Sequence, residues 1–180
     1  MPTKSYPKAA LKDATPRTGG YMSDEELQEL QLEHYSEALR FMDNAKDCLK
    51  KAQKDGNYYR DTKYVKMACG TAYSGVLTGL DGYLAIKGVR PDKKVRKTIE
   101  YYQYNLGKLD RKMLDHLICA YQILHLSGYY DGTQSVNVVK EGFEEAKTLI
   151  DKIKPASLNG SPCINGSATT PAKSKSKGRA

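Results

Sequence analysis

The sequence predicts an all-α protein, an antiparallel bundle of four or five helices joined by short connections. Apolar residues recur at helical spacing over most of the chain. No segment shows the alternation of apolar and polar residues that is typical of a strand. Capping residues at the starts of the helical segments, and glycine or proline at their ends, divide the chain into separate helices.

The helical domain is expected to span residues 23–154, between two ends that we expect to be disordered. Residues 1–22 and 155–180 are basic, rich in small and turn-forming residues, and poor in bulky apolar ones. Such segments cannot offset the conformational entropy that is lost on ordering. The chain carries a formal net charge of +8, of which the two ends hold +3 and +4, so the domain keeps +1. A nearly neutral domain does not predict a basic nucleic-acid groove.

The first helix is predicted to run from residue 23 to about Asp55. It opens on the capping-box sequence SDEE at residues 23–26, in which serine and glutamate satisfy each other's backbone amides. Acidic residues at its start and lysines at its end suit the helix dipole. Gly56 and Asn57 follow, and they are expected to stop the helix.

A second helix is predicted over residues 58–87, ending at Gly88, and it carries a ridge of small residues along one side. The ridge is formed by Ala68, Ala72, Gly75, Gly79 and Gly82. A glycine inside a helix costs about 1 kcal/mol relative to alanine. This many glycines on one side therefore predict that another backbone comes very close. That neighbour is either a helix of the same chain, which is the more common use of such a ridge, or a second copy of the protein.

The remainder of the domain is predicted to hold three more helices. We expect one around residues 95–106 and another around 109–126, separated at Gly107. The sequence SGYYDG at residues 127–132 is expected to form a loop. The last helix is predicted over about 134–153, where a lysine-proline pair ends it.

Parts of the first two predicted helices resemble the HEPN superfamily of small helical bundles, which are often dimeric. The stretches that carry this resemblance are ALRFMDNAKDCLKKA and ACGTAYSGVLTGLDGYLAIKG. The stretches YYRDTKYVKMACGTAY and AYQILHLSGYYDG are similar to a group of uncharacterised bacterial bundle proteins within or near that superfamily. Together they cover roughly residues 36–153. Active members of the superfamily are metal-independent ribonucleases with an R-x(4–6)-H motif, and other members bind nucleotides or partner proteins.

The resemblance extends the catalytic motif to one pair of residues, Arg111 and His116, within RKMLDHL. It implies that the histidine acts as general base on a 2′-hydroxyl and that the arginine stabilises the scissile phosphate. On an unbroken helix the two side chains diverge by about 140°. Asp115 is placed to pair with Arg111 in an i,i+4 ion pair on the solvated face. Lys112 stands where the superfamily commonly has Asn, Asp or His. The catalytic pair is therefore the alternative hypothesis.

A candidate pocket lies near His125, whose neighbours in the sequence include Tyr129, Tyr130 and Asp131. The histidine is either a polar group at the mouth of a pocket or a structural residue bonded to nearby backbone. Tyrosine dominates the aromatic residues, with fourteen Tyr, two Phe and no Trp. Tyrosines beside basic residues are able to stack nucleobases. They are equally able to bury the ring and keep the hydroxyl in water.

No cofactor or metal site is predicted. The sequence holds no Walker A loop, no G-x-G-x-x-G after a strand, no G-x-S-x-G, and no H-E-x-x-H or paired E-x-x-H. Its four cysteines have no metal-ligand spacing, which indicates reduced thiols in an intracellular protein. No signal peptide and no apolar run long enough to span a membrane are present in the sequence, so a cytoplasmic location is expected.

The sequence favours a non-enzymatic bundle that acts by association with itself or with another protein. The ridge of small residues, the nearly neutral domain and the diverging motif side chains carry this prediction. The alternative is a metal-independent ribonuclease that uses Arg111 and His116. A third hypothesis is binding of single-stranded RNA through the tyrosines and the basic ends.

Overall fold

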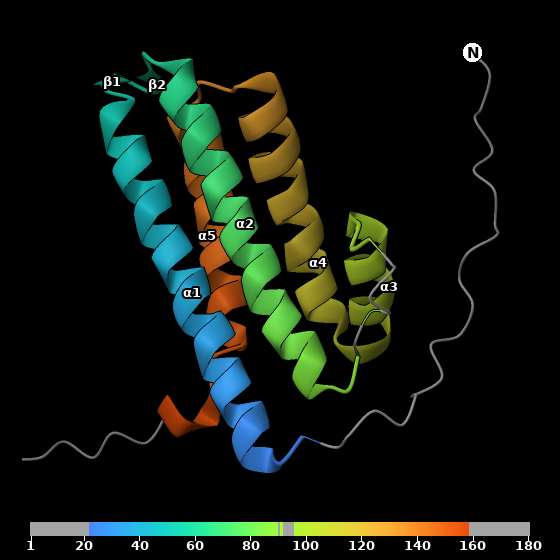
Figure 1. The fold of residues 1–180 in the computed structure, drawn as a ribbon. Helices are drawn as coiled ribbons and strands as arrows, with labels where there is room; N and C mark the ends of the chain where they lie inside the picture. The colour runs from blue at the N-terminus through green and yellow to red at the C-terminus, as the bar shows by residue number, and fades with distance from the viewer. Residues whose placement is uncertain (1–21, 90, 92–95, 159–180) are drawn as a thin grey trace, which may run out of the picture.

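The structure is a computed structural model that describes residues 22–89, 91 and 96–158 (Figure 1). Most of both ends that we expect to be disordered lies outside the described residues. The elements, in chain order, are α1 (Asp24–Lys51), β1 (Lys54–Asp55), β2 (Tyr58–Tyr59), α2 (Thr62–Ile86), α3 (Ile99–Leu109), α4 (Arg111–Ala120), the π-helix η1 (Tyr121–Asp131), α5 (Val136–Lys152) and the 3-10 turn η2 (Ala156–Leu158).

The predicted all-α class is confirmed. The long helices α1, α2 and α5 and the continuous pair α4–η1 run side by side, and the short α3 lies beside one end of α4 (Figure 1). The most extensive packing joins α1 to α2, and further contacts join α2 to η1 and α4 to α5. No helix in the described ranges combines the length and apolarity needed to cross a membrane.

The helix starts are set by local side-chain chemistry. The predicted capping box is confirmed, because the Ser23 hydroxyl accepts from the Glu26 amide and the Glu26 carboxylate accepts from the Ser23 amide. Asp61 caps α2 by accepting from the Lys63 amide at 2.9 Å. Asp110 caps α4 in the same manner.

The predicted absence of strands is wrong at one place, between α1 and α2. Lys54–Asp55 pairs with Tyr58–Tyr59 in an antiparallel hairpin of two residues a side, so α2 begins at Thr62 rather than at residue 58. Gly56 lies in the hairpin turn with φ +58°, a conformation that favours glycine. Strands this short leave no alternating pattern in the sequence.

The predicted division of this region into two helices is confirmed, but the predicted position of the break, at Gly107, is wrong. Helix α3 runs through Gly107 to Leu109, and the chain breaks at Asp110, where φ −154° and ψ 100° are extended. The Asp110 carboxylate accepts from the Met113 amide at 3.0 Å, which stabilises the break as the start of α4. Leu109 lies exposed at the end of α3.

Residues 127–131 are helical, which corrects the predicted loop. The helix continues as η1 to Asp131 and ends at Gly132, whose φ of +74° is left-handed. Contacts with α2 hold this segment: Lys66 Nζ donates to the Tyr130 carbonyl at 2.8 Å, and Gly128 packs directly against Cys69. Tertiary contacts therefore override the turn-forming composition of SGYYDG.

The core lies between α1, α2, α4–η1 and α5. Its largest fully buried side chains include Leu80, Leu117, Leu124 and Ile150, and Leu106 of α3 joins them. Helix α1 contributes Tyr35, Ala38, Met42 and Ala45. No polar or charged side chain is buried among the described residues. Functional chemistry in this part of the molecule is therefore confined to the surface and to the grooves between helices.

Candidate functional site

The ridge of small residues on α2 faces α1 of the same chain. Ala68 and Ala72 are fully inaccessible to solvent, and the three ridge glycines are buried as well. A Cβ atom at Gly75 would lie 2.8 Å from Phe41 Cβ, and one at Gly82 would lie 2.5 Å from His34 Cβ. At Gly79 the added atom would collide with the Ile153 side chain.

These distances show why the ridge consists of small residues. Real Cβ contacts are essentially never this short, so a larger residue at Gly75 or Gly82 would force α1 away from α2. The sequence leaves two neighbours possible for the ridge, a helix of the same chain or a second copy of the protein. The structure places a helix of the same chain, α1, on the ridge. The ridge is therefore not a surface on which a second copy would dock.

Arg111 and His116 each contact a different carboxylate. Arg111 lies at the start of α4 with its side chain 78% exposed, and its Nε is 3.7 Å from Asp115 Oδ1, so the predicted ion pair is confirmed. His116 is half-buried against α5, where its Nδ1 lies 2.6 Å from Glu145 Oε2. Within one chain the structure therefore does not bring the two motif residues onto a common point.

The surroundings of His116 are acidic. Cys119 lies one turn further along α4, and the pKa of its thiol is raised by partial burial and by the charges of Glu145, Glu141 and Asp115. A raised pKa keeps the thiol protonated and unreactive at neutral pH. The acidic side chains around His116 also oppose the approach of an anionic phosphate.

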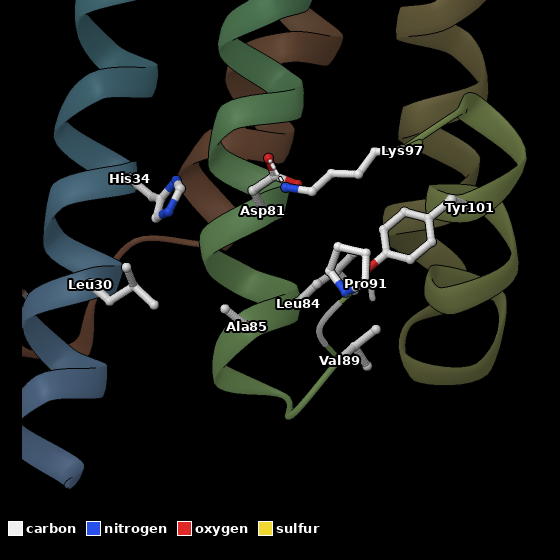
Figure 2. A pocket seen from close by; sticks show the side chains of 9 residues that line it. All are labelled: Leu30, His34, Asp81, Leu84, Ala85, Val89, Pro91, Lys97 and Tyr101. Carbon is white, nitrogen blue, oxygen red and sulfur yellow. Dashed lines mark hydrogen bonds and ion pairs between the residues drawn. The ribbon is translucent and has the colours of Figure 1, made fainter. Parts of the chain in front are cut away.

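A small groove opens between α1, the end of α2 and the start of α3 (Figure 2). Its volume is about 260 Å³. Asp81 and Lys97 on its wall form an ion pair of 2.7 Å, and the Tyr102 hydroxyl donates to Asp81 at 2.9 Å. His34 Nδ1 is 3.1 Å from the Thr78 carbonyl oxygen. His34, Asp81 and Lys97 of this groove thus have partners within the chain.

A larger groove lies between α1, α2 and η1, and we call it the His125 groove. Its volume is about 520 Å³. The lining residues are mostly apolar or aromatic: Phe41, Lys66, Met67, Gly70, Thr71, Tyr73, Ser74, Leu77, His125 and Tyr129. Two of them are large and markedly exposed, with Met67 at 47% and Tyr129 at 48%. Concave, mostly apolar surfaces of this size are typical of binding sites.

The ring of His125 lies at the centre of four tyrosines. Its centroid is 5.3 Å from that of Tyr121 and 5.8 Å from that of Tyr129, and both pairs are stacked, with interplanar angles of 24° and 18°. Tyr73 lies 4.9 Å away with a tilted ring, and Tyr130 lies 5.2 Å away edge-on. Offset and edge-to-face pairs of this kind each contribute about 0.5–1.5 kcal/mol beyond area burial.

The structure brings part of the predicted pocket together. His125 and Tyr129 line the groove, Tyr130 packs on the histidine ring, and Asp131 ends η1 outside the lining. Sequence reasoning missed the wall contributed by α2 and the ring of Phe41 from α1. A signal for the α2 wall exists, because Met67, Gly70, Ser74 and Leu77 recur at helical spacing on one side of that helix.

The electrostatics of the His125 groove are simple. Partial burial lowers the pKa of His125 below its ordinary value of 6.5, so the imidazole is neutral at pH 7. Burial raises the pKa of the Tyr73 hydroxyl, which therefore stays protonated. Lys66 supplies the formal charge of the lining, and no carboxylate is among the lining residues that the structure describes. The groove is thus apolar with one positive edge.

Metal chemistry has no candidate in the described ranges, where no three His, Cys, Asp or Glu side chains are grouped so as to hold an ion. The three cysteines of this part, Cys48, Cys69 and Cys119, are free thiols. Burial raises the pKa of Cys69 to about 12, so this thiol acts as a packing residue beneath η1.

Comparisons with known proteins identify a family and a solved relative of this chain. The family model described as a domain of unknown function, DUF5618, matches residues 33–155. The solved structure of a protein of unknown function from Dyadobacter fermentans is 41% identical in sequence, with a TM-score of 0.60. The match covers 68% of this chain and 94% of that chain. The curated proteins contain no match. The region matched by the family includes every residue that lines the His125 groove.

Proposed function

The chain belongs to the family of the domain of unknown function DUF5618, and we propose that it is a non-enzymatic binding protein whose His125 groove receives an apolar side chain of a partner protein. The observation that carries this proposal is the groove itself, about 520 Å³ in volume and walled by aromatic rings and a methionine. We place this activity in the cytoplasm, as the cysteine pattern predicts.

The residue types of the groove support protein binding. Tyrosine and methionine are enriched at protein interfaces, and tyrosine is over-represented among the residues that dominate binding energy. Tyr129 and Met67 stand at the mouth of the groove with about half of their surface in water. Contact with a partner would remove this apolar surface from water, which contributes about 25 cal/mol per Å².

The proposal is tested by selecting binders from a displayed random-peptide library and measuring their affinity for variants of the protein. Met67→Gln and Tyr129→Ser are expected to weaken binding by about tenfold, because each removes an apolar wall of the groove. Leu109→Gln is the matched control, since Leu109 is a similarly exposed apolar side chain on α3, outside the groove. Selected peptides whose affinity is unchanged by both groove variants would contradict the proposal.

A second candidate function is the metal-independent cleavage of RNA, together with the HEPN-like affiliation that implies it. The observation that favours it is the short contact between His116 and Glu145, because a carboxylate that holds an imidazole is a common way to orient a general base. Arg111 would have to reach the same phosphate from a second chain. The structure supports this candidate less well than the first, since Arg111 is paired with Asp115 on a solvated face.

RNA cleavage without divalent metal tests this second candidate. If it is correct, His116→Ala and Glu145→Gln both abolish cleavage, while His34→Ala, a histidine on another helix, retains it. Absence of cleavage by the wild-type protein over a panel of single-stranded RNAs would exclude it.

A further inference from the structure

The His125 groove also indicates what kind of partner it fits, and this inference rests on the proposed function. We propose that the occupant is a protein segment that places an aromatic side chain in the groove and an Asp or Glu carboxylate next to it, against Lys66. The aromatic rings define the first element of this segment, and the uncompensated charge of Lys66 defines the second.

The ring arrangement favours an aromatic anchor. Tyr121, His125 and Tyr129 form a nearly parallel series, and Tyr129 ends it with about half of its surface exposed. A planar side chain from a partner can extend the series by stacking on Tyr129. The neutral state of His125 keeps the series free of a buried positive charge. Met67 lies on the opposite wall and adapts to rings of different shape, because its thioether side chain is flexible.

Lys66 supplies the carboxylate preference. Its Nζ donates to a neutral acceptor, the Tyr130 carbonyl, at 2.8 Å. Among the ion pairs of the described residues, none includes Lys66. Lys63 lies one turn earlier on α2 and is also exposed. On α1, Glu37 lies one turn before Phe41 and is paired with Arg40, and Asp43, two residues after Phe41, is paired with Lys46.

Lys66 at the edge of the groove therefore forms no ion pair within the described part of the chain. An ammonium group at the edge of an apolar groove forms a stronger hydrogen bond with a carboxylate than with a neutral acceptor. It would equally oppose a lysine or arginine at the same position in the partner.

The same charge argues against a second copy as the occupant. A two-fold axis that passed through this groove would bring it against its own counterpart. Each copy would then present Lys66 and no carboxylate from the lining to the other. An acidic segment of a different protein complements the groove where a second copy does not.

The inference is tested with short blocked peptides and the full chain, by following the Met67 methyl signal in NMR titrations. The probe peptide is Gly-Glu-Phe-Glu-Gly, and the matched peptides replace both Glu by Gln, both Glu by Lys, or Phe by Ala. We expect the acidic aromatic peptide to shift the Met67 signal and to bind about fivefold more tightly than its Gln counterpart. The Ala peptide is expected to leave the signal in place.

Charge reversal in the protein provides the second arm. Lys66→Glu is expected to transfer the preference from the Glu peptide to the Lys peptide, and Lys66→Gln to abolish it. Both variants change a groove-edge side chain, and their circular dichroism and unfolding midpoints establish that they are folded. Equal affinities of the Glu, Gln and Lys peptides for the wild-type protein would overturn the inference.

The outcomes separate this inference from the proposed function. If aromatic peptides shift the Met67 signal regardless of their charge, the proposal of a protein-binding groove stands and the proposal of an acidic partner is rejected. If no aromatic peptide shifted Met67, the proposed function would fail together with the inference. A short single-stranded RNA that shifted Met67 at lower concentration than any peptide would replace the protein partner by a nucleic acid.

Discussion

The two sides of helix α2 meet their neighbours in opposite ways. On the side of α1, Gly75 and Gly82 let the helices approach until a Cβ atom no longer fits between them. Between α1 and η1, by contrast, Met67, Ser74 and Leu77 of α2 line the groove of about 520 Å³. One helix therefore supplies a tight seam that stabilises the bundle and an open seam that is available for binding. The close packing of α1 on α2 stabilises the folded bundle, whereas the groove leaves the apolar side chains of Met67 and Tyr129 partly in water.

Replacement of a glycine in the tight seam is expected to have the largest effect on stability. Gly75→Val places new atoms against Phe41 Cβ at 2.8 Å and against the Ala38 carbonyl oxygen at 3.1 Å. Backbone atoms cannot move aside cheaply, so we expect a loss of about 3 kcal/mol in the free energy of unfolding. Urea unfolding followed by circular dichroism measures it.

Gly70→Ala in the open seam is the matched control for this prediction. The new methyl group meets the Tyr129 ring at 3.0 Å, and that half-exposed ring can shift toward solvent. The gain in helix propensity of about 1 kcal/mol offsets part of the cost. We expect a net change within about 1 kcal/mol. Equal losses in both variants would show that the two seams are packed alike.

An intermediate effect is expected at the point where η1 touches α2. Gly128→Ala would place its methyl group 2.5 Å from Cys69 Sγ and 2.6 Å from Cys69 Cβ. We expect a loss of about 2 kcal/mol, because Cys69 is fully buried and cannot turn away. The double variant Gly128→Ala/Cys69→Gly exchanges the small residue across the seam and is expected to recover part of the loss. A double-mutant cycle measures the coupling.

The open seam is also expected to show a smaller, pH-dependent effect. Burial lowers the pKa of His125 below 6.5, so the folded protein binds this proton less tightly than the unfolded chain does. The contribution to stability is therefore complete above about pH 6.5 and is lost as the pH falls through the folded pKa.

His125→Gln should remove this pH dependence of stability. Urea unfolding midpoints, measured at about four pH values between pH 8 and pH 5, would reveal it. The matched control is His34→Gln, which leaves His125 in its tyrosine cluster and is expected to retain the same slope. A slope that disappears in His34→Gln instead would assign the pH dependence to the small groove of Figure 2.

The smallest effect is expected away from both seams. Arg111→Ala removes an ion pair of 3.7 Å between side chains that are mostly in water. Exposed i,i+4 pairs contribute about 0.2–0.5 kcal/mol, so the unfolding free energy should change by no more than this. A loss above about 2 kcal/mol would show that Arg111 has a structural contact beyond Asp115.

Features that depend on neighbouring residues in the chain could be predicted from the sequence. The capping box at Ser23 and the Arg111–Asp115 pair follow from spacing alone, and both are present. The glycine ridge predicted a close approach of helices, although the sequence left the partner open. The break at Asp110 was not predicted, because an N-capping aspartate and a helical glycine compete there, and the cap prevails.

The candidate site shows why the remainder was out of reach. His125 and Tyr129 are close in sequence, so their association with a pocket could be predicted. The opposite wall comes from α2 and from Phe41 of α1, and its position depends on how three elements pack. The helical state of residues 127–131 depends on Lys66 and on Cys69, more than fifty residues earlier, as the contacts of η1 show.

The π-helical form of η1 has a consequence for comparing this chain with its relatives. A π-turn closes on the fifth residue rather than the fourth, so η1 holds more residues per turn than a regular helix. Deleting one residue between His125 and Tyr129 would rotate everything after it by roughly a quarter of a turn. Tyr129 and Tyr130 would then leave the ring of His125 with the amino-acid composition almost unchanged. The length of this segment in an alignment, more than the count of tyrosines, would tell which relatives keep the groove.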